Sequence, residues 1–449
     1  MPGLPILGNA LEFLKEPLDV IERGHKSLGN VFRFRLGDKD VVVGLGPENA
    51  KTVFEETDKL LSIREAYPFF TRMFNKRLYF FAEPAEYKEQ RELILPCFQG
   101  KRMAGYVEVM SREAGRFLDA LGASGTFDLN EQIGPLVMNV AAAAFLGEDF
   151  RTRMPPEFFE LFRDFSGGME LLWPLWLPLP HLRRSARAKE ALRKTVLKLI
   201  AERKTTPREP ADFLQVLAES QFGDELIADL ILMLVWAGHE TTTGQTSWTL
   251  VDLMQHPDWL GEVRAEADEV IGDAGPRDME QAKRLKKMEW TVKESERLHP
   301  VAYMLLRAAK EELTLGGYHV PKGAMVATSP WFSHRLPEVF SEPQKYDPRR
   351  FSAERAEDKQ PYSMSGFGGS THRCAGVNFA YLEMKVVVAM IVQRFELELV
   401  NPSPRPMKGA KSKWPESPCR VRYKLREGQT VHAVPSEWPI AKASGCPFH

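Results

Sequence analysis

Apolar residues recur at helical spacing over most of this sequence. Four segments show the pattern most clearly, at residues 82–98, 156–172, 187–204 and 224–256. Apolar positions at i, i+3, i+4 and i+7 are typical of helices with one buried face. The last segment far exceeds an average helix, and at about 1.5 Å per residue it would cross a whole domain. We therefore expect a long central helix.

Strand patterns are shorter and lie near the two ends of the chain. Residues 30–46 read as a hairpin around Gly37–Asp38, and residues 313–330 read as a second pair around a Gly-Gly turn. Residues 419–435 show a third such pattern. The expected fold class is mainly α with small β-sheets. We expect one domain over 1–449, with residues 436–449 as a peripheral tail.

Composition and charge narrow the class of protein. The chain has 449 residues, of which 43% are hydrophobic and 27% charged, and its formal net charge is -1. This balance is ordinary for a soluble globular protein and gives no field that would attract nucleic acid. No apolar run reaches the ~18 residues of a membrane span. We expect a soluble, cytoplasmic protein. Whether a membrane anchor precedes residue 1 is left open.

An apolar stretch at 171–184, "LLWPLWLPLPHLRR", is interrupted by three prolines. One interpretation is a loop packed into the core. The other is an exposed apolar lip, which would make a peripheral membrane contact or border a substrate mouth, because exposed apolar patches usually mark interaction sites.

The segment "FGGSTHRCAGVNFAYLEMK" places Cys374 in a loop just before an apolar helical pattern. The other cysteines lie far from it in sequence and show no paired metal spacing, which suits a reducing compartment. A lone cysteine is usually a small hydrophobic residue. Here His372, Arg373 and the helix start all favour a thiolate. Glycines allow a partner to approach the loop backbone closely: Gly366, Gly368 and Gly369. One thiolate suits an axial bond to a flat cofactor, and haem is the leading case.

Two further segments contain polar or charged residues that are expected to be buried and are therefore candidates for a structural or catalytic role. In "KESERLHP", Glu294 and Arg297 lie three residues apart on one helical face. Apolar neighbours suggest that the pair is buried, and Arg350 in "YDPRRF" is a further partner. In "AGHETTTG", Glu240 and Thr241 interrupt the apolar central helix, where buried polar groups need a reason. Thr241 could also bond a backbone carbonyl and bend the helix.

Together these three segments resemble the cytochrome P450 superfamily of haem-thiolate monooxygenases, in that family's order. Within the superfamily, the sequence is most similar to the sterol 14α-demethylases. The similar stretches are "YPFFTRMF", "SWTLVDLMQHP", "KESERLHP", "MLLRAAK", "HRCAGVNFAY" and "PCRVRYKLR". The resemblance implies a long central helix over haem b and a cysteine loop beneath it.

The resemblance also implies roles for individual residues. Cys374 would be the axial ligand of the haem iron. The haem propionates would contact Tyr67, Lys88, Arg307 and His372. A structural triad would comprise Glu294, Arg297 and Arg350. The substrate cavity would be lined by Phe69, Phe74 and Leu305. Glu240 and Thr241 would be catalytic and relay protons during oxygen activation.

The implied reaction is oxidation of a large apolar substrate with O₂, and the resemblance favours a sterol or related terpenoid. Alternatives are another lipophilic substrate, such as a fatty acid or secondary metabolite, or a haem-binding sensor or isomerase on the same fold. Electrons would come from NAD(P)H through a separate ferredoxin or flavoprotein reductase. The chain departs from the demethylase pattern at several positions: His239-Glu240-Thr241 in place of His-His-Thr, Asn75, Phe81, Ser370 and Thr371.

Overall fold

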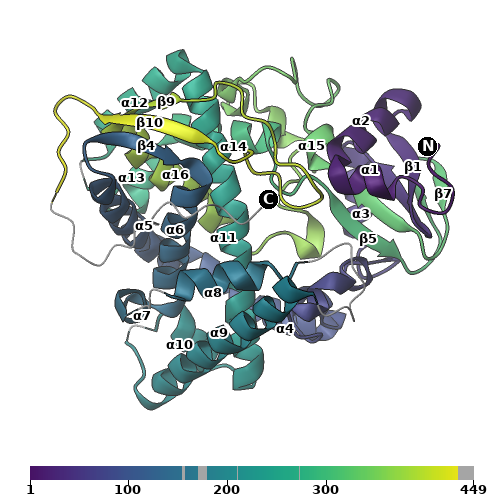
Figure 1. Cartoon of the computed structure of the whole chain (residues 1–449), viewed down its shortest axis with the longest axis horizontal. Coiled ribbons are helices and arrows are strands. Elements are labelled where there is room, and N and C mark those ends of the chain that lie inside the picture. Colours follow the sequence, from purple (N-terminus) through teal and green to yellow (C-terminus); the bar gives the residue numbers. More distant parts are fainter. Residues whose placement is uncertain (154–156, 170–178, 210, 273, 433–449) are drawn as a thin grey trace.

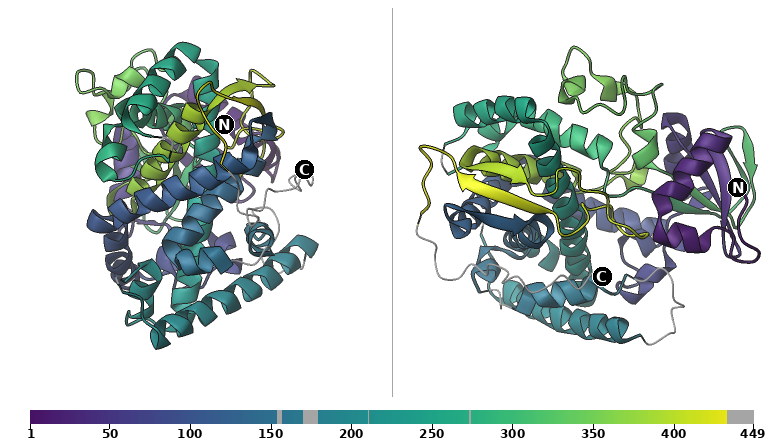
Figure 2. Two further views of the ribbon diagram at one scale, coloured as in Figure 1. Left: turned by 90° about the vertical axis from the view of Figure 1, so that its left-hand side faces the viewer. Right: turned by 45° about the horizontal axis from the view of Figure 1, so that its top comes forward.

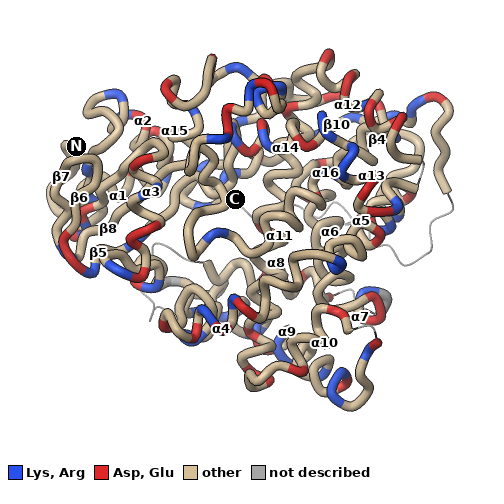
Figure 3. The backbone as a smooth tube through the Cα atoms, turned by 180° about the vertical axis from the view of Figure 1, so that it is seen from behind, with Lys and Arg blue, Asp and Glu red and all other residues tan. Residues whose placement is uncertain are grey.

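Helix α11 (Asp224–Gln255) runs through the middle of the molecule and organises the fold (Figure 1). The computed structural model describes residues 1–449 except 154–156, 170–178, 210, 273 and 433–449. Between Asp229 and Asp252 the helix sequence holds one charged residue, Glu240, so α11 is almost uniformly uncharged along its central part (Figure 3). A helix that is apolar on most sides belongs in a protein interior, and the prediction of a long central helix is confirmed.

The helices in most extensive contact with α11 are α6 (Leu129–Ala141), α9 (Pro180–Thr205), α14 (Lys286–Leu298) and α16 (Val377–Arg394). Pro257 follows the end of α11 and begins α12 (Pro257–Val270). Proline is well suited to the first position of a helix and cannot continue a preceding one. The long helix therefore ends where its sequence provides a stop.

The other helices surround this centre. They are α1 (Ala10–Lys15), α2 (Pro17–Leu28), α3 (Pro47–Glu55), α4 (Pro84–Ile94), α5 (Gly100–Leu121), α7 (Glu148–Arg153), α8 (Glu157–Ser166), α10 (Phe213–Ala218), α13 (Met279–Arg284) and α15 (Pro330–Ser333). Figure 2 shows the N-terminal helices and their sheet at one end of the molecule, with the large helices at the other.

The largest sheet joins the N-terminal part of the sequence to residues 305–328. Its strand order is β1-β2-β8-β5-β3. The strands are β1 (Val31–Leu36), β2 (Lys39–Gly44), β8 (Met325–Thr328), β5 (Leu305–Ala309) and β3 (Leu61–Ser62). Strand β2 runs parallel to β8, and the remaining pairs are antiparallel. The predicted hairpin at Gly37–Asp38 is confirmed, since Leu36 pairs with Lys39.

Two smaller sheets complete the described strands. The first has the order β4 (Ser124–Asp128), β10 (Arg420–Leu425), β9 (Phe395–Leu399). The second is the hairpin of β6 (Leu313–Leu315) and β7 (Tyr318–Val320), whose turn is the predicted Gly316–Gly317. The mainly helical fold class with small sheets is therefore confirmed.

Some predicted boundaries differ from the structure for local reasons. Helix α8 ends at Ser166, before the Gly167–Gly168 pair that weakens a helix. Helix α4 ends at Ile94, and Pro96 then lies in a short 3-10 turn. The third strand pattern yields one strand, β10, with partners elsewhere in the chain.

Two expectations concern segments that are only partly described. Most of the apolar stretch 171–184 lies outside the described residues, and its last residues begin α9 at Pro180. The expected tail, 436–449, also lies outside them. Among the helices of the described part, none is long and apolar enough to cross a membrane.

Candidate active site

Residues 365–376 form a tight loop that presents Cys374 before the first turn of α16. The Cys374 amide donates a hydrogen bond to the Phe367 carbonyl at 2.9 Å, which closes the loop. Gly368 has a φ of +71°, a conformation that glycine adopts without strain. At Gly369, a Cβ would meet the Phe54 ring at 2.6 Å, so only glycine fits there. The backbone thus fixes the position of the sulfur.

The thiol of Cys374 differs from the other described cysteines. Cys374 is exposed, whereas Cys97 and Cys419 are buried, and burial raises their pKa values to about 11 and about 12. Burial by the surrounding protein also raises the pKa of Cys374, while the Gly376 amide and Arg91 lower it. Cys374 is therefore exposed and yet surrounded by enough protein to disfavour its charged form. A coordinating metal ion would remove this thiol proton.

A buried polar cluster lies beside the loop. His372 is held by Asp58, with Nε2 2.6 Å from Oδ2, and its ring stacks on Tyr87 at 4.2 Å between centroids. Arg307 is buried in the middle of β5, where Tyr67, Asp58 and Tyr87 are the titratable groups that act on it. Burial lowers the pKa of Arg307 and raises the pKa of Tyr67. The structure therefore brings together Tyr67, Arg307 and His372.

Lys88 is not brought to this cluster. Its side chain is 76% exposed on the outer face of α4, and its ammonium lies 3.9 Å from Glu92. Arg91 occupies the inner face, where Nη1 donates to the Tyr87 hydroxyl at 3.2 Å and to the Arg373 carbonyl at 2.9 Å. Residues four apart share a helix face. Arg91 therefore lies on the same face as Tyr87, and an aromatic residue four positions before Arg91 was the signal that Arg91, and not Lys88, faces inwards. Sequence reasoning missed both residues.

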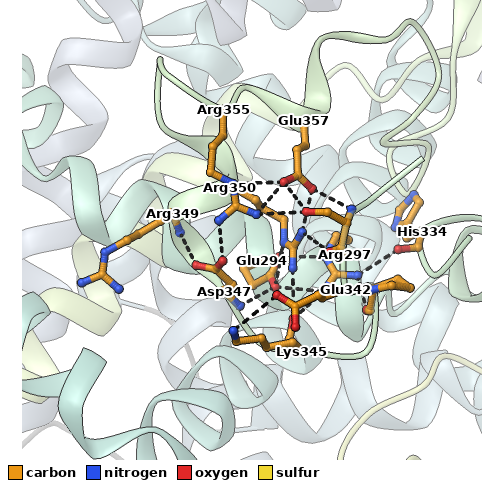
Figure 4. A network of polar contacts seen from close by, with 12 residues as sticks. Glu294, Arg297, His334, Glu342, Lys345, Asp347, Arg349, Arg350, Arg355 and Glu357 are labelled. Carbon is orange, nitrogen blue, oxygen red and sulfur yellow. Dashed lines mark hydrogen bonds and ion pairs between the residues drawn. The ribbon is translucent and has the colours of Figure 1, made fainter. Parts of the chain in front are cut away.

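The charge network of Glu294, Arg297 and Arg350 is fully buried and directly connected (Figure 4). Arg350 reaches Glu294 from Nε to Oε2 at 3.0 Å. A second carboxylate, Glu357, receives Nη1 of Arg350 at 2.7 Å. The Nη1 group of Arg297 donates to the carbonyl oxygen of His334 at 2.9 Å. Each buried charge thus has an ionic partner and further hydrogen bonds, as buried ions require.

Glu240 and Thr241 lie side by side in α11 but point to different neighbours. The Thr241 hydroxyl donates to the Ala237 carbonyl at 2.8 Å, and this side chain is exposed. Burial raises the pKa of Glu240, and a hydrogen bond to Ser166 and the charge of Lys411 partly offset that effect. The structure does not bring the two side chains together, because adjacent residues lie about 100° apart on a helix.

Aromatic side chains gather above the central part of α11. Phe74 is buried and packs against Phe165 at 5.6 Å and Trp236 at 5.7 Å between ring centroids. Phe70 contacts the same tryptophan at 5.4 Å. Leu305 is half-buried at the start of β5. The side chain of Phe69 lies outside the described part of the structure.

These features fit a haem. An accessible sulfur lies in a glycine-shaped loop, and a buried arginine nearby would match the acidic edge of the macrocycle. Leu305 and the aromatic rings supply apolar contacts for a flat, largely apolar group.

Comparison with known proteins gives consistent results. A family model described as "Cytochrome P450" matches residues 1–421. A sterol 14-demethylase of Arabidopsis thaliana is 32% identical over 440 residues, covering 94% of this chain and 90% of that protein. A sterol 14alpha-demethylase of Mycolicibacterium vanbaalenii is 30% identical over 435 residues, covering 93% and 96%.

A solved structure shares the fold over nearly the whole chain. Retinoic acid-bound cyanobacterial CYP120A1 superposes with a TM-score of 0.86 at 26% sequence identity, covering 95% of this chain and 99% of that one. The cysteine loop, the buried charge network and the central helix therefore occur in a chain whose sequence and fold agree with one family over most of its length. The protein belongs to the cytochrome P450 family of haem-thiolate monooxygenases.

Proposed function

We propose that this cytochrome P450 monooxygenase oxidises a sterol or a related terpenoid at a haem b bound by Cys374. The observation that carries the cofactor assignment is the accessible Cys374 sulfur in its fixed loop. The substrate class is supported by the sterol 14-demethylase relatives at about 30% identity and by the aromatic cluster around Phe74 and Trp236.

Four further residues are proposed to hold the haem. Arg307 and Arg91 would neutralise the propionates, while Tyr67 and His372 would border them. Arginine suits this task because its planar guanidinium matches a carboxylate in two parallel hydrogen bonds. When bound, a thiolate-ligated haem supplies O₂ activation with electrons from a redox partner.

Thr241 and Glu240 are proposed to relay protons during oxygen activation. Thr241 is exposed, and its hydroxyl donates a hydrogen bond to the Ala237 carbonyl. Because the hydroxyl hydrogen is used in this bond, the oxygen can still accept a hydrogen bond from a proton donor. Burial holds the pKa of Glu240 above its usual value, which brings a carboxyl closer to the range useful for proton transfer near neutral pH.

Phe74 and Leu305 are proposed to contact the substrate, together with Phe70 and Trp236. These side chains offer apolar surface and few polar groups, as expected for a lipophilic ligand. Electrons would come from NAD(P)H through a ferredoxin or a flavoprotein reductase, and we propose that the protein acts in the cytoplasm.

One observation favours a second substrate class. The solved structure that shares this fold at TM-score 0.86 holds retinoic acid, which is an isoprenoid carboxylic acid and not a sterol. An isoprenoid acid, or a fatty acid of similar length, is therefore the second candidate.

The test is a spectral titration of the haem-loaded protein with sterols, isoprenoid acids and fatty acids. A substrate that binds beside the haem would shift its Soret band, so each ligand yields a dissociation constant. Phe74→Ala should weaken the preferred class at least about tenfold, because losing a buried aromatic contact costs about 1.4 kcal/mol or more. Tight binding of an isoprenoid acid or fatty acid with no sterol response would replace the sterol proposal by the second candidate.

A further inference from the structure

Glu296 lies between the two triad residues of α14 in sequence, but its carboxyl group faces the cysteine loop. The side chain is 3% exposed. Its Oε2 accepts a hydrogen bond from the Tyr381 hydroxyl on α16 at 2.5 Å. On the other side, Oε1 lies against Gly366, where an added Cβ would be only 2.3 Å away. The carboxyl group is thus enclosed between α16 and the first residues of the loop.

Two short connections lead from this carboxyl group to the cysteine. The Tyr381 ring packs on the Phe367 ring at 5.1 Å between centroids. Phe367 in turn accepts the hydrogen bond of the Cys374 amide through its carbonyl oxygen at 2.9 Å. Glu296 therefore contacts the arm of the loop that fixes Cys374, and it does so without touching the cysteine.

Few charges compensate this carboxyl group. Lys293, on the same helix, is 2.9 Å from Asp358 and is shared with it. The positive charge of Arg373, in the loop, and the hydrogen bond from the Tyr381 hydroxyl, on α16, also stabilise the Glu296 carboxylate. These groups and the Gly366 amide lower the pKa of Glu296, but burial outweighs them and raises it to about 7. Both protonation states are therefore accessible near neutral pH.

We propose that Glu296 is a positioning residue for the cysteine ligand, holding the Gly366–Phe367 arm with Tyr381 and coupling its own charge to the reduction of the haem. The inference rests on the proposed ligation of haem by Cys374. It adds a residue that acts through the loop and has no contact with substrate.

The sign of the coupling follows from electrostatics. Reduction adds one negative charge to the haem, and a Glu296 carboxylate repels that charge across a low-dielectric interior. Deprotonation of Glu296 therefore lowers the reduction potential. By linkage, reduction raises the pKa of Glu296 by the same factor.

The experiment measures the midpoint potential of the haem between pH 6 and pH 8 in the parent and three variants. In the parent, the reduction equilibrium should fall about fivefold or more over this range, which is about 40 mV for a one-electron couple. Glu296→Gln should be independent of pH and match the parent at acid pH. Tyr381→Phe removes a donor that stabilises the carboxylate, so its transition should move to higher pH.

Glu289→Gln is the matched control, because Glu289 lies on the same helix and its carboxylate is paired with Lys385. It should follow the parent. A parent potential that does not change between pH 6 and pH 8 would overturn the inference, as would a Glu296→Gln variant that keeps the parent's pH dependence. If Glu296→Gln fails to load haem, the parent profile and the Tyr381→Phe shift still decide the question.

The carbon monoxide spectrum of the reduced parent separates this inference from the proposed function. Absence of a thiolate-type Soret band would refute ligation by Cys374. A normal band with a flat potential profile would refute only the role of Glu296.

Discussion

The guanidinium group of Arg297 donates two hydrogen bonds to the carboxylate of Glu294, from Nε to Oε2 at 2.7 Å and from Nη2 to Oε1 at 2.9 Å. Both side chains are fully buried. The same carboxylate accepts Nε of Arg350 and the amide of Asp347. One carboxylate therefore pairs with two buried cations, and Glu357, which pairs with Arg350, supplies the second negative charge of the network.

Glu294→Ala should be strongly destabilising, because it leaves Arg297 without its ionic partner in a region closed to water. The expected loss is about 3–5 kcal/mol in the free energy of unfolding, measured by denaturant titration, with low haem content on purification. Glu342→Ala is the control, since Glu342 pairs with Lys345 at the surface and should change stability by about 0.5 kcal/mol or less. Normal stability and haem content in Glu294→Ala would contradict a structural role for the triad.

Cys374→Ala should abolish the red-shifted Soret band of the reduced carbon monoxide complex, because the thiolate ligand is lost. Cys97→Ala removes a buried sulfur at some distance in sequence from the loop and should retain the band. The two absorption spectra, normalised to haem content, give the comparison. Retention of the band in Cys374→Ala would show that another residue ligates the iron.

Thr241→Ala should bind substrate and accept electrons but release hydrogen peroxide in place of product. This residue is exposed in the central part of α11. Product and peroxide formed per reductant consumed are the measured quantities. Thr241→Ser keeps the hydroxyl and its hydrogen bond to Ala237, so it should stay coupled. Equal coupling in Thr241→Ala would leave only the helix-shaping role of this residue.

Glu240→Gln should slow turnover by about 10²-fold or more if the carboxyl group transfers protons. The glutamine keeps the size of the side chain and its hydrogen bond to Ser166 but cannot titrate. Ser166→Ala is a useful comparison, because removing the hydrogen bond that stabilises the carboxylate should raise the pKa of Glu240 further and shift the pH profile upward. A Glu240→Gln variant with parental turnover would assign the proton transfer to other groups.

Acid sensitivity should depend on His334. This histidine is fully buried, its Nε2 accepts the Ser365 amide at 2.9 Å, and burial with the nearby charge of Arg297 lowers its pKa to about 3. The unfolded chain takes up a proton near pH 6.5 and the folded one does not, so folding stability declines as pH falls from about 6.5 towards 3. From pH 7 to pH 5 the loss from this residue should be about 2 kcal/mol.

His334→Gln keeps an acceptor for the Ser365 amide and removes the titrating group. Chemical unfolding of the parent and this variant at pH 7 and pH 5 checks the difference. A variant with the same acid-induced loss as the parent would show that other groups carry it.

The sequence pattern predicted the elements that depend on local chemistry. The long helix α11 follows from 32 residues that hold one charged side chain, Glu240, between Asp229 and Asp252, with a proline stop at Pro257. The hairpin at Gly37–Asp38 follows from a short turn between alternating strands. The buried pairing of Glu294 with Arg297 follows from their spacing on one helix face, with apolar neighbours on both sides.

Contacts between distant segments were less accessible to sequence reasoning. Lys88 and Arg91 are both basic residues of α4, and only the packing of the inner face against the cysteine loop distinguishes them. Glu240 is adjacent to Thr241 in sequence, but its neighbour Ser166 comes from the end of another helix. The sequence around Glu296 did not indicate its position beside the cysteine loop, because its partners Tyr381 and Gly366 lie far along the chain.

The parallel pairing of β2 with β8 has a consequence for the order of events during synthesis. Val43 is aligned with Ala327, which follows it by 284 positions, and the two segments lie side by side at one end of the molecule (Figure 1). At about 5–20 residues per second, a ribosome needs roughly a quarter of a minute to a minute to add that length. Throughout this interval the edge of β2 that later pairs with β8 is free. Its unpaired backbone N–H and C=O groups can bind another chain, so the nascent protein is prone to aggregation and is a suitable chaperone substrate.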